Sequence, residues 1–315
     1  MKMKTYWLAG GLLAVLAAAP ALAQTIDRQA ALDGLVAAEK AFSKKAGETT
    51  IHDAFVAFMA ADGVLFRPEP TDAQTFLRGQ PARPGLLTWF PAFAEVSLAG
   101  DLGYDTGPAE YRDKAGDKPD QSQFASIWKK QADGSWKVMV DLGVPAVPPM
   151  PVAISLQGPA KIETSALPKA DARAKDDLIL ADREFSKAEG LFNAAAAYRA
   201  HLADDGRLLR AGRGLVVGKE AAVALVSGED GNLRWNPAGS GISRSGDLGY
   251  TYGVVERNEK GSAEWVKTAN YMRVWRRAAA GGPWKIAFDV LSPRPKVTPK
   301  PVEKPVEEKK PSGGE

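Results

Sequence analysis

Two arginines and two aspartates recur at equivalent places in the two halves of this sequence, and their side chains suit anion binding or proton transfer. Arg67 and Arg210 each follow an Asp-Gly pair, while Asp141 and Asp289 each follow a Trp-Lys pair. A guanidinium group binds carboxylate or phosphate through paired hydrogen bonds, and a positioned carboxyl group can carry a proton. Each residue also has a plainer interpretation, as a surface or ion-paired arginine or as an aspartate that caps a turn.

Aromatic side chains and one more arginine complete the predicted ligand pocket. Tyr104 and Tyr250 belong to the repeated phrase Gly-Asp-Leu-Gly-Tyr and also suit a buried core. Tyr252, Tyr271 and Arg273 have no counterpart in the first half, which favours the second half as the working site. The tryptophans are expected to pack in the cores or to line a pocket entrance. The candidates are Arg67, Trp89, Tyr104 and Asp141 in the first half, and Arg210, Trp235, Tyr250, Tyr252, Tyr271, Arg273 and Asp289 in the second.

Several common chemistries do not fit this sequence. It has two histidines, His52 and His201, and no cysteine, so a zinc site of the His/Cys type is not expected. No G-x-S-x-G motif is present to begin a catalytic triad. The glycines of 212–218 lack the spacing of a phosphate-binding loop, and Glu220 stands where such a loop needs Ser or Thr. We therefore predict no metal and no cofactor, and assign no catalytic residue.

The composition is that of a globular protein whose charge lies mainly at its ends. The 315 residues suggest two domains of ordinary size. Of the formal charge of +3, two units come from Lys2 and Lys4 and two from the Pro/Lys/Glu-rich tail, which leaves residues 24–292 at −1. A nearly neutral body has no basic surface for nucleic acid, so no nucleic-acid partner is predicted.

The first 23 residues have the three parts of a secretory signal peptide. Lys2 and Lys4 precede the apolar run Leu8–Ala19, and Ala21-Leu22-Ala23 offers small residues for a signal peptidase. The apolar run is shorter than the roughly 20 residues that span a bilayer, so no stable membrane insertion is expected after cleavage. Without cysteine there is no lipobox. We predict a periplasmic or secreted protein.

Between its ends the chain repeats itself. Phe42 and Phe185, like Gly63 and Gly206, are 143 residues apart, and the matches extend over a whole domain length. Proline-rich stretches separate the copies and follow the second one. The predicted organisation is a signal peptide at 1–23, a first domain at 24–146, a linker at 147–172, a second domain at 173–292 and a disordered tail at 293–315.

Each copy predicts the same order of elements. Apolar residues at helical spacing indicate a first helix, and alanine-rich runs at Ala54–Ala61 and Ala194–Ala203 indicate a second. An Asp-Gly pair then leads into a short strand. The next strand is predicted at Thr75–Arg78 or Gly214–Val217, before a third helix that carries Trp89 in the first copy. A meander of strands closes each copy, with a hairpin at Asp133-Gly134.

Four phrases of the second copy carry a family resemblance. They are Ala203–Gly206, Gly218–Ala221, Ser245–Gly253 and Trp284–Asp289. Together they resemble the SnoaL-like branch of the nuclear-transport-factor-2-like (NTF2-like) superfamily, which includes ketosteroid isomerases and polyketide cyclases. The resemblance covers roughly residues 30–146 and 174–292. It implies an α+β fold of two tandem cone-shaped domains, each with three helices packed on a curved antiparallel sheet.

The resemblance does not carry over the isomerase chemistry. Ketosteroid isomerases use a carboxylate base, and a tyrosine with a protonated carboxyl group as the oxyanion hole. In this sequence the position of the base falls at or near Arg67 and Arg210. A guanidinium group cannot abstract a proton. This difference argues against ketosteroid-type isomerisation in either copy and favours an anionic group on a ligand.

Three functions remain open at this point. The leading prediction is a duplicated small-molecule-binding module for an organic ligand. The alternative is a cofactor-independent isomerase, cyclase or lyase in the second domain, with Asp289 as proton carrier, Tyr252 or Tyr271 as donor and Arg210 as anion anchor. A third is structural: the two domains pack as a pseudo-dimer within a monomeric chain.

Overall fold

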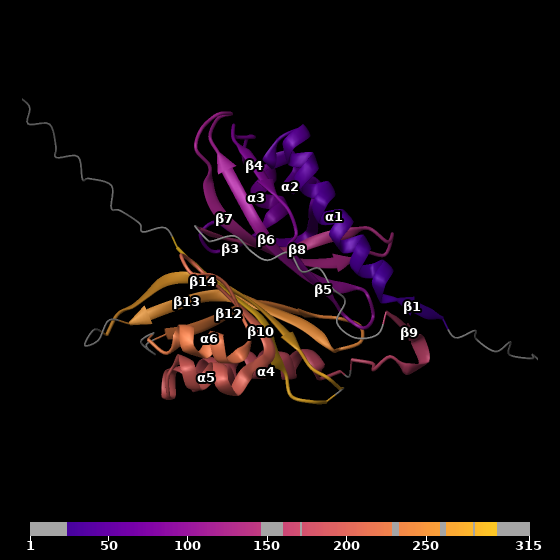
Figure 1. Cartoon of the computed structure of the whole chain (residues 1–315), viewed down its shortest axis with the longest axis vertical. Helices are drawn as coiled ribbons and strands as arrows, with labels where there is room; N and C mark the ends of the chain where they lie inside the picture. Colours follow the sequence, from indigo (N-terminus) through magenta and orange to yellow (C-terminus); the bar gives the residue numbers. More distant parts are fainter. Residues whose placement is uncertain are drawn as a thin grey trace, which may run out of the picture.

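The computed structural model describes residues 24–145, 160–170, 172–228, 233–258, 263–279 and 281–294. In this part the chain forms two α+β units, each with its helices on the outer face of a curved sheet (Figure 1). The α+β class and the two-unit fold are thereby confirmed. The predicted signal peptide, most of the predicted linker and most of the tail lie outside the described residues. No helix within the described ranges is long and apolar enough to cross a bilayer.

The first unit combines three helices with a seven-stranded sheet. The helices are α1 (Arg28–Glu48), α2 (Ile51–Phe58) and α3 (Ala73–Arg78). The strands run in the order β3-β2-β8-β7-β6-β4, with β5 pairing separately with β6. Their bounds are β2 Met59–Phe66, β3 Pro70–Asp72, β4 Leu86–Trp89, β5 Phe93–Val96, β6 Leu102–Arg112, β7 Asp120–Lys130 and β8 Trp136–Pro145. A separate pair joins β1 (Thr25–Asp27) to β9 (Lys161–Glu163), which lies in the predicted linker and precedes a 3₁₀ turn, Thr164–Ala166.

The second unit repeats this plan with a six-stranded sheet in the order β11-β10-β15-β14-β13-β12. Its helices are α4 (Ala174–Leu191), α5 (Ala194–His201) and α6 (Lys219–Val226). Its strands are β10 Leu202–Arg210, β11 Gly214–Val217, β12 Leu233–Ile242, β13 Leu248–Asn258, β14 Trp265–Arg276 and β15 Lys285–Pro293. Neighbouring strands are antiparallel except for one parallel pair in each sheet, β2 with β8 and β10 with β15.

Local sequence accounts for where the helices begin and what they bury. The Asp27 side chain accepts a hydrogen bond from the Ala30 amide at the start of α1, as is usual for a helix N-cap. Leu32, Leu35 and Phe42 lie on one face of α1 and are buried against the sheet. At the predicted hairpin, Gly134 turns the chain from β7 to β8 with φ +85°, a conformation that glycine adopts without steric cost.

Two local predictions in the first unit are wrong. Residues Thr75–Arg78, predicted as a strand, belong to helix α3, because the Asp72 side chain caps the Thr75 amide and buried Ala73 and Leu77 follow a helical spacing. Trp89 does not lie on a helix but ends strand β4. The predicted strand Gly214–Val217 is present as β11.

The two sheets face each other and share a buried core (Figure 1). Tyr104 of β6 stacks on Phe288 of β15 with ring centroids 5.6 Å apart. Near one end, the Asp247 carboxylate accepts a hydrogen bond from the Leu98 amide at 2.9 Å. Directly after β15, Arg294 of the predicted tail forms an ion pair with Glu69 at 2.8 Å. A separate core lies between each sheet and its own helices.

Candidate functional site

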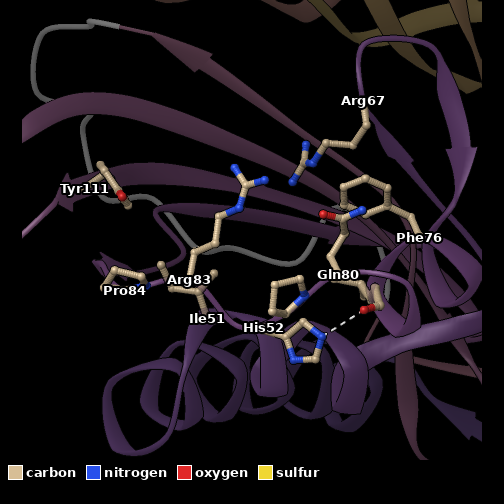
Figure 2. Close-up of a pocket in the computed structure, with 10 residues that line it drawn as sticks. Ile51, His52, Arg67, Phe76, Gln80, Arg83, Pro84 and Tyr111 are labelled. Carbon is tan, nitrogen blue, oxygen red and sulfur yellow. Dashed lines mark hydrogen bonds between the residues drawn. The ribbon is translucent and has the colours of Figure 1, made fainter.

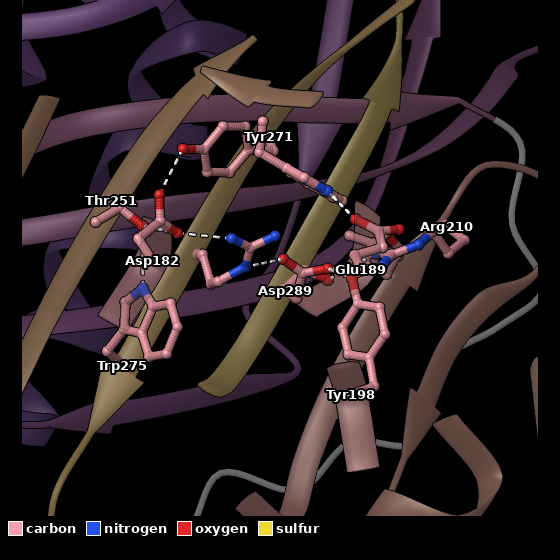
Figure 3. A network of polar contacts seen from close by, with 11 residues as sticks. Asp182, Glu189, Tyr198, Arg210, Thr251, Tyr271, Trp275 and Asp289 are labelled. Carbon is pink, nitrogen blue, oxygen red and sulfur yellow. Dashed lines mark hydrogen bonds and ion pairs between the residues drawn. The ribbon is translucent and has the colours of Figure 1, made fainter. Parts of the chain in front are cut away.

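The interior of the second domain is built around Arg273, which lies on β14 and is fully buried. Its Nε donates to Asp289 Oδ1 on β15 at 2.6 Å, and its Nη1 donates to Asp182 Oδ1 on α4 at 2.6 Å. Tyr271 donates its hydroxyl hydrogen to the other Asp182 oxygen at 2.8 Å, and Thr251 donates to Oδ1 at 3.0 Å (Figure 3). The two carboxylates are thus held by one guanidinium and by hydroxyl groups.

Arg210, predicted to bind a ligand, belongs to the same network. Its Nη2 donates to Asp289 Oδ2 at 2.6 Å and to the Tyr198 hydroxyl at 2.5 Å, and Tyr198 donates to the same Asp289 oxygen at 2.5 Å (Figure 3). Burial alone would raise the pKa of Asp289, but Arg273 and Arg210 outweigh it and hold that pKa below its usual range. Asp289 therefore stays ionised and is a poor proton carrier.

Aromatic rings enclose the Arg273 guanidinium. Its central carbon lies 4.1 Å from the ring centroid of Phe185 and 4.4 Å from that of Trp235, distances at which cation–π attraction is favourable. The structure brings together Arg210, Tyr271, Arg273 and Asp289, and these side chains bind one another or Asp182. Their side chains fill the space in which the sequence had placed a ligand.

The first domain has a different interior at the equivalent positions. Ser126 stands where the second domain has Arg273, and buried Glu39 and Asp105 occupy the places of Asp182 and Thr251. The carboxyl groups of Glu39 and Asp105 both accept a hydrogen bond from the same Trp128 indole, so the two acids lie close together in this interior. Burial raises the pKa of Glu39 to about 7 and that of Asp105 well above its usual range.

Two indole groups hold this carboxyl pair in place. Trp128 Nε1 lies 2.9 Å from Glu39 Oε2 and 3.2 Å from Asp105 Oδ1, so one N–H group faces both residues. Trp89 Nε1 donates to the other oxygen of Glu39. Trp89 is therefore a buried, hydrogen-bonded residue of the interior. Its counterpart Trp235 is placed in the same way, with Nε1 donating to Glu189, whose pKa burial raises to about 7.

Asp141 is a third carboxyl group of the first interior and is partly exposed to solvent. It accepts a hydrogen bond from Ser126 at 3.0 Å. Its desolvated position raises the pKa of Asp141 to about 6, although the Ser126 hydrogen bond and the charge of Arg67 lower it. A carboxyl group with a pKa in this range changes its protonation state near neutral pH. Asp141 thus differs from its counterpart Asp289, which stays ionised.

A pocket of about 300 Å³ opens beside Arg67 in the first domain, between α2, α3, the loop that follows α3 and the end of β6. Figure 2 shows the guanidinium groups of Arg67 and Arg83 pointing into the same space, with Gln80 and His52 nearby. The lining residues are Ile51, His52, Arg67, Phe76, Leu77, Gln80, Pro81, Arg83, Pro84 and Tyr111. This lining combines apolar walls with two fixed positive charges and has no carboxyl group.

The polar groups of the pocket have defined neighbours. Arg67 donates to the Phe66 carbonyl oxygen at 2.8 Å, and within the described ranges neither Arg67 nor Arg83 forms an ion pair with a carboxylate. His52 lies between two acceptors, the Leu77 carbonyl oxygen at 2.9 Å and Asp53 at 3.1 Å. The hydrogen bonds to Leu77 and Asp53 raise the pKa of His52 above its ordinary value. Protonated His52 would add a third positive charge to the pocket wall.

The remaining predicted tyrosines lie on the opposite face of each sheet. Tyr104, Tyr250 and Tyr252 all belong to or contact the core between the two domains, not a cone interior. Tyr104 donates its hydroxyl hydrogen to Glu95 at 2.6 Å, and Tyr252 packs edge-on against Phe66 at 6.3 Å. These three residues therefore join the domains.

Sequence reasoning missed five residues of the interiors: Glu39, Asp105, Asp182, Glu189 and Tyr198. A signal was present for two of them. Glu39 and Asp182 each lie three residues before a buried phenylalanine, on the apolar stripe of the first helix. An acid on such a stripe must find buried partners, because an unpaired buried carboxylate is strongly unfavourable.

Comparisons with known proteins point to one group of folds. No protein-family model and no curated protein matches the chain. Among solved structures, a protein of unknown function with a cystatin-like fold from Nostoc punctiforme is 16% identical, with a TM-score of 0.35, and covers 41% of this chain and 96% of its own length. A ketosteroid isomerase-like protein from Erwinia carotovora atroseptica is 20% identical, with a TM-score of 0.31 and coverages of 41% and 100%. An NTF2-like protein of unknown function from Pseudomonas putida is 18% identical, with a TM-score of 0.32 and coverages of 45% and 99%.

The chain is therefore similar to NTF2-like and ketosteroid isomerase-like proteins, as the sequence predicted. Each of these matches covers less than half of this chain.

Proposed function

We propose that this protein is an exported small-molecule-binding protein that holds an organic anion in the pocket of its first domain. The observation that carries the proposal is the lining of that pocket, in which Arg67, Arg83 and His52 bring positive charge and which includes no carboxyl group. Guanidinium groups on one wall suit a carboxylate or phosphate, which they bind through charge-assisted hydrogen bonds. The export part of the proposal rests on the signal-like first 23 residues.

The size and walls of the pocket restrict the ligand. About 300 Å³ is at the small end of the range for ligand sites. Ile51, Phe76 and Leu77 give one side an apolar surface, while Arg67 and Arg83 form the polar end. A compact apolar or aromatic body with one anionic group fits this division, and aromatic monocarboxylates are the simplest molecules of that kind.

The second domain takes a supporting role in this proposal. The ion pairs of Arg273 and Arg210 fill its interior, so a ligand would have to displace buried, mutually paired charges. The core that the two sheets share, with Tyr104 against Phe288, supports a fused pseudo-dimer within a monomeric chain. Light scattering that gives the mass of one chain is the expected result, and a homodimer would contradict this part.

The binding proposal is tested by calorimetric titration of the full-length chain with benzoate at pH 6. Arg67→Gln and Arg83→Gln are each expected to weaken binding about 10-fold to 100-fold, because each removes charge-assisted hydrogen bonds worth about 1.5–3 kcal/mol. Arg234→Gln is the matched control, since Arg234 is an exposed arginine of the second domain that pairs with Glu256. Equal affinity in all four proteins, or no binding by the wild type, would refute the proposal.

A second experiment identifies the natural ligand. Native mass spectrometry is applied to the chain purified gently from the producing cell. An extra mass that is lost on denaturation and absent from the Arg67→Gln variant would support the pocket and give the chemical class of its ligand. An extra mass that both variants of the pocket arginines retain would place the ligand elsewhere and contradict the assignment to this pocket.

A further inference from the structure

We propose that the second domain carries a separate binding site for an aliphatic organic anion, at the end of its sheet where β14 ends and β15 begins. A hollow of about 580 Å³ opens there, between the start of β10, the first residue of α6 and the residues that follow β14 and precede β15. We call it the β14–β15 hollow. The residue that carries the proposal is Arg277, which lines this hollow.

Arg277 is a buried arginine whose charge has no ionic partner among the described residues. Only 3% of its surface is exposed, and its Nε donates to the Gly246 carbonyl oxygen at 2.5 Å. Its Nη2 is buried and has no hydrogen-bond partner in the described part of the chain. On one side the guanidinium lies over the ring of Trp284, 4.6 Å from the centroid. A buried charge without a counter-ion is strongly unfavourable, and an anion in the hollow would supply the missing charge.

The two carboxylates of the lining do not compensate Arg277, because each already has another cation. Asp204 forms an ion pair with Lys219 at 2.6 Å. Asp205 pairs with Arg276, which also reaches Glu95 of the first domain at 2.9 Å. Neither aspartate forms an ion pair with Arg277. These pairs fix one wall of the hollow and leave the buried guanidinium beside it uncompensated.

Lys285 adds a further positive charge to the lining. Its ammonium group donates to the Ala200 carbonyl oxygen at 2.6 Å, and it forms no ion pair with a carboxylate within the ranges that the structure describes. The lining therefore contains four cationic side chains and two carboxylates. An excess of positive charge in a recess attracts anions, so a carboxylate head group is the favoured occupant.

The uncharged walls restrict the body of the ligand. They consist of small aliphatic side chains, and the lining includes no aromatic ring. These side chains are Leu202, Ala203, Ala278, Ala279 and Pro283. The volume is almost twice the 300 Å³ of the pocket in the first domain. A flexible aliphatic chain that ends in a carboxylate fits these walls, and medium-chain carboxylates such as decanoate are the simplest molecules of that kind.

The hollow is not a second copy of the pocket in the first domain. Lys130 is the counterpart of Arg277, since its amide donates to the Asp101 carbonyl oxygen at 2.8 Å as that of Arg277 donates to Asp247 at 2.9 Å. Lys130 is exposed, whereas Arg277 is buried. The first-domain pocket lies beside Tyr111, near the end of β6. The hollow lies where β14 pairs with the start of β13, which is the counterpart of β6. The two sites therefore occupy opposite ends of their sheets.

The test is calorimetric titration with sodium decanoate of the full-length chain carrying Arg67→Gln, which weakens the anion pocket of the first domain. Adding Arg277→Met should weaken decanoate binding about 10-fold to 100-fold, because it removes the buried charge and keeps an apolar contact with Trp284. Lys130→Met is the matched control at the exposed counterpart and should leave the affinity unchanged.

Ala278→Glu provides a second variant that does not disturb the core, since Ala278 is exposed on the wall of the hollow. It adds a carboxylate to the site and should weaken decanoate binding about 10-fold or more, whereas the uncharged Ala278→Gln should not. Equal affinity in these two proteins, or no decanoate binding by the Arg67→Gln chain, would overturn the proposal. A lower Tm for Arg277→Met with unchanged decanoate affinity would show a purely structural arginine and would also overturn it.

Inorganic phosphate tests the aliphatic part of the assignment. It carries the charge without an apolar body, so it should bind the Arg67→Gln chain at least about 10-fold more weakly than decanoate does. Phosphate binding as tight as that of decanoate would overturn the assignment of an aliphatic ligand. Benzoate binding by the Arg277→Met chain with Arg67 intact should equal that of the wild type, which separates this site from the pocket of the first domain.

Discussion

Replacing Arg273 by methionine is the sharpest test of how the second domain is held together. Methionine is similar in length and packs well against aromatic rings such as Phe185 and Trp235, so the main loss is the charge. The Asp182 and Asp289 carboxylates each lose a contact of 2.6 Å and stay buried. Removing one partner from a buried ion pair costs about 3–5 kcal/mol. We expect the free energy of unfolding to fall by about that amount and Tm by about 10–20 °C.

The pH dependence of this loss follows from the pKa of Asp289. In the wild type that pKa is depressed, so the stability it contributes is present above the unfolded pKa of about 4 and is lost as pH falls through the folded value. In Arg273→Met this contribution is absent, and the uncovered carboxyl groups bind protons more readily. The difference between variant and wild type should therefore be largest at pH 7.5 and shrink toward pH 4.5.

Urea unfolding, followed by tryptophan fluorescence and by far-ultraviolet circular dichroism, measures both effects. Arg234→Met is the matched control, because Arg234 forms an exposed ion pair with Glu256 at 3.4 Å and should contribute about 0–1 kcal/mol. A loss below about 1 kcal/mol for Arg273→Met, or a loss that does not change with pH, would refute the view that the second interior is held by these charges.

Three further predictions concern the two domain interiors and the core between the sheets. Asp105→Asn imitates the protonated acid. In the wild type the pKa values of Asp105 and Glu39 are raised, so the free energy of unfolding falls as pH rises from about 4 toward the folded pKa values. Urea unfolding of the variant should therefore show a smaller fall in the free energy of unfolding between pH 5 and 8 than the wild type shows. Tyr198→Phe removes a hydroxyl group that is hydrogen-bonded to Asp289, so thermal unfolding should show that the free energy of unfolding falls by about 1–3 kcal/mol. A fall below about 0.5 kcal/mol would contradict the buried role of this hydroxyl group. Phe288→Ala opens a cavity between the two sheets and should lower the free energy of unfolding by about 3–5 kcal/mol. Leu180→Ala, at an exposed position, should lower it by less than about 0.5 kcal/mol.

Much of the architecture could be predicted because it depends on local patterns and on the internal repeat. Helix stripes such as Leu32, Leu35 and Phe42, alanine-rich second helices and the Asp133-Gly134 turn are properties of short segments. The prediction was wrong at Thr75–Arg78 and at Trp89, where one element ends and the next begins within a few residues. At Thr75–Arg78 the Asp72 side chain accepts a hydrogen bond from the Thr75 amide, and this N-cap stabilises a helix.

The sequence by itself determined that there are two copies of one α+β unit, that an arginine and an aspartate recur in both, and that only the second copy has Arg273. Only the tertiary structure decided which charges meet. Asp182 and Arg273 are 91 residues apart in the chain, and their contact depends on how α4 packs across the sheet. In the first domain, Glu39, Asp105 and Asp141 belong to an interior in which Ser126 stands in place of that arginine. Arg67 of the same domain lines a pocket. The extra arginine in the second copy, which in the sequence suggested a ligand site, closes that interior because a buried guanidinium must be paired with buried carboxylates.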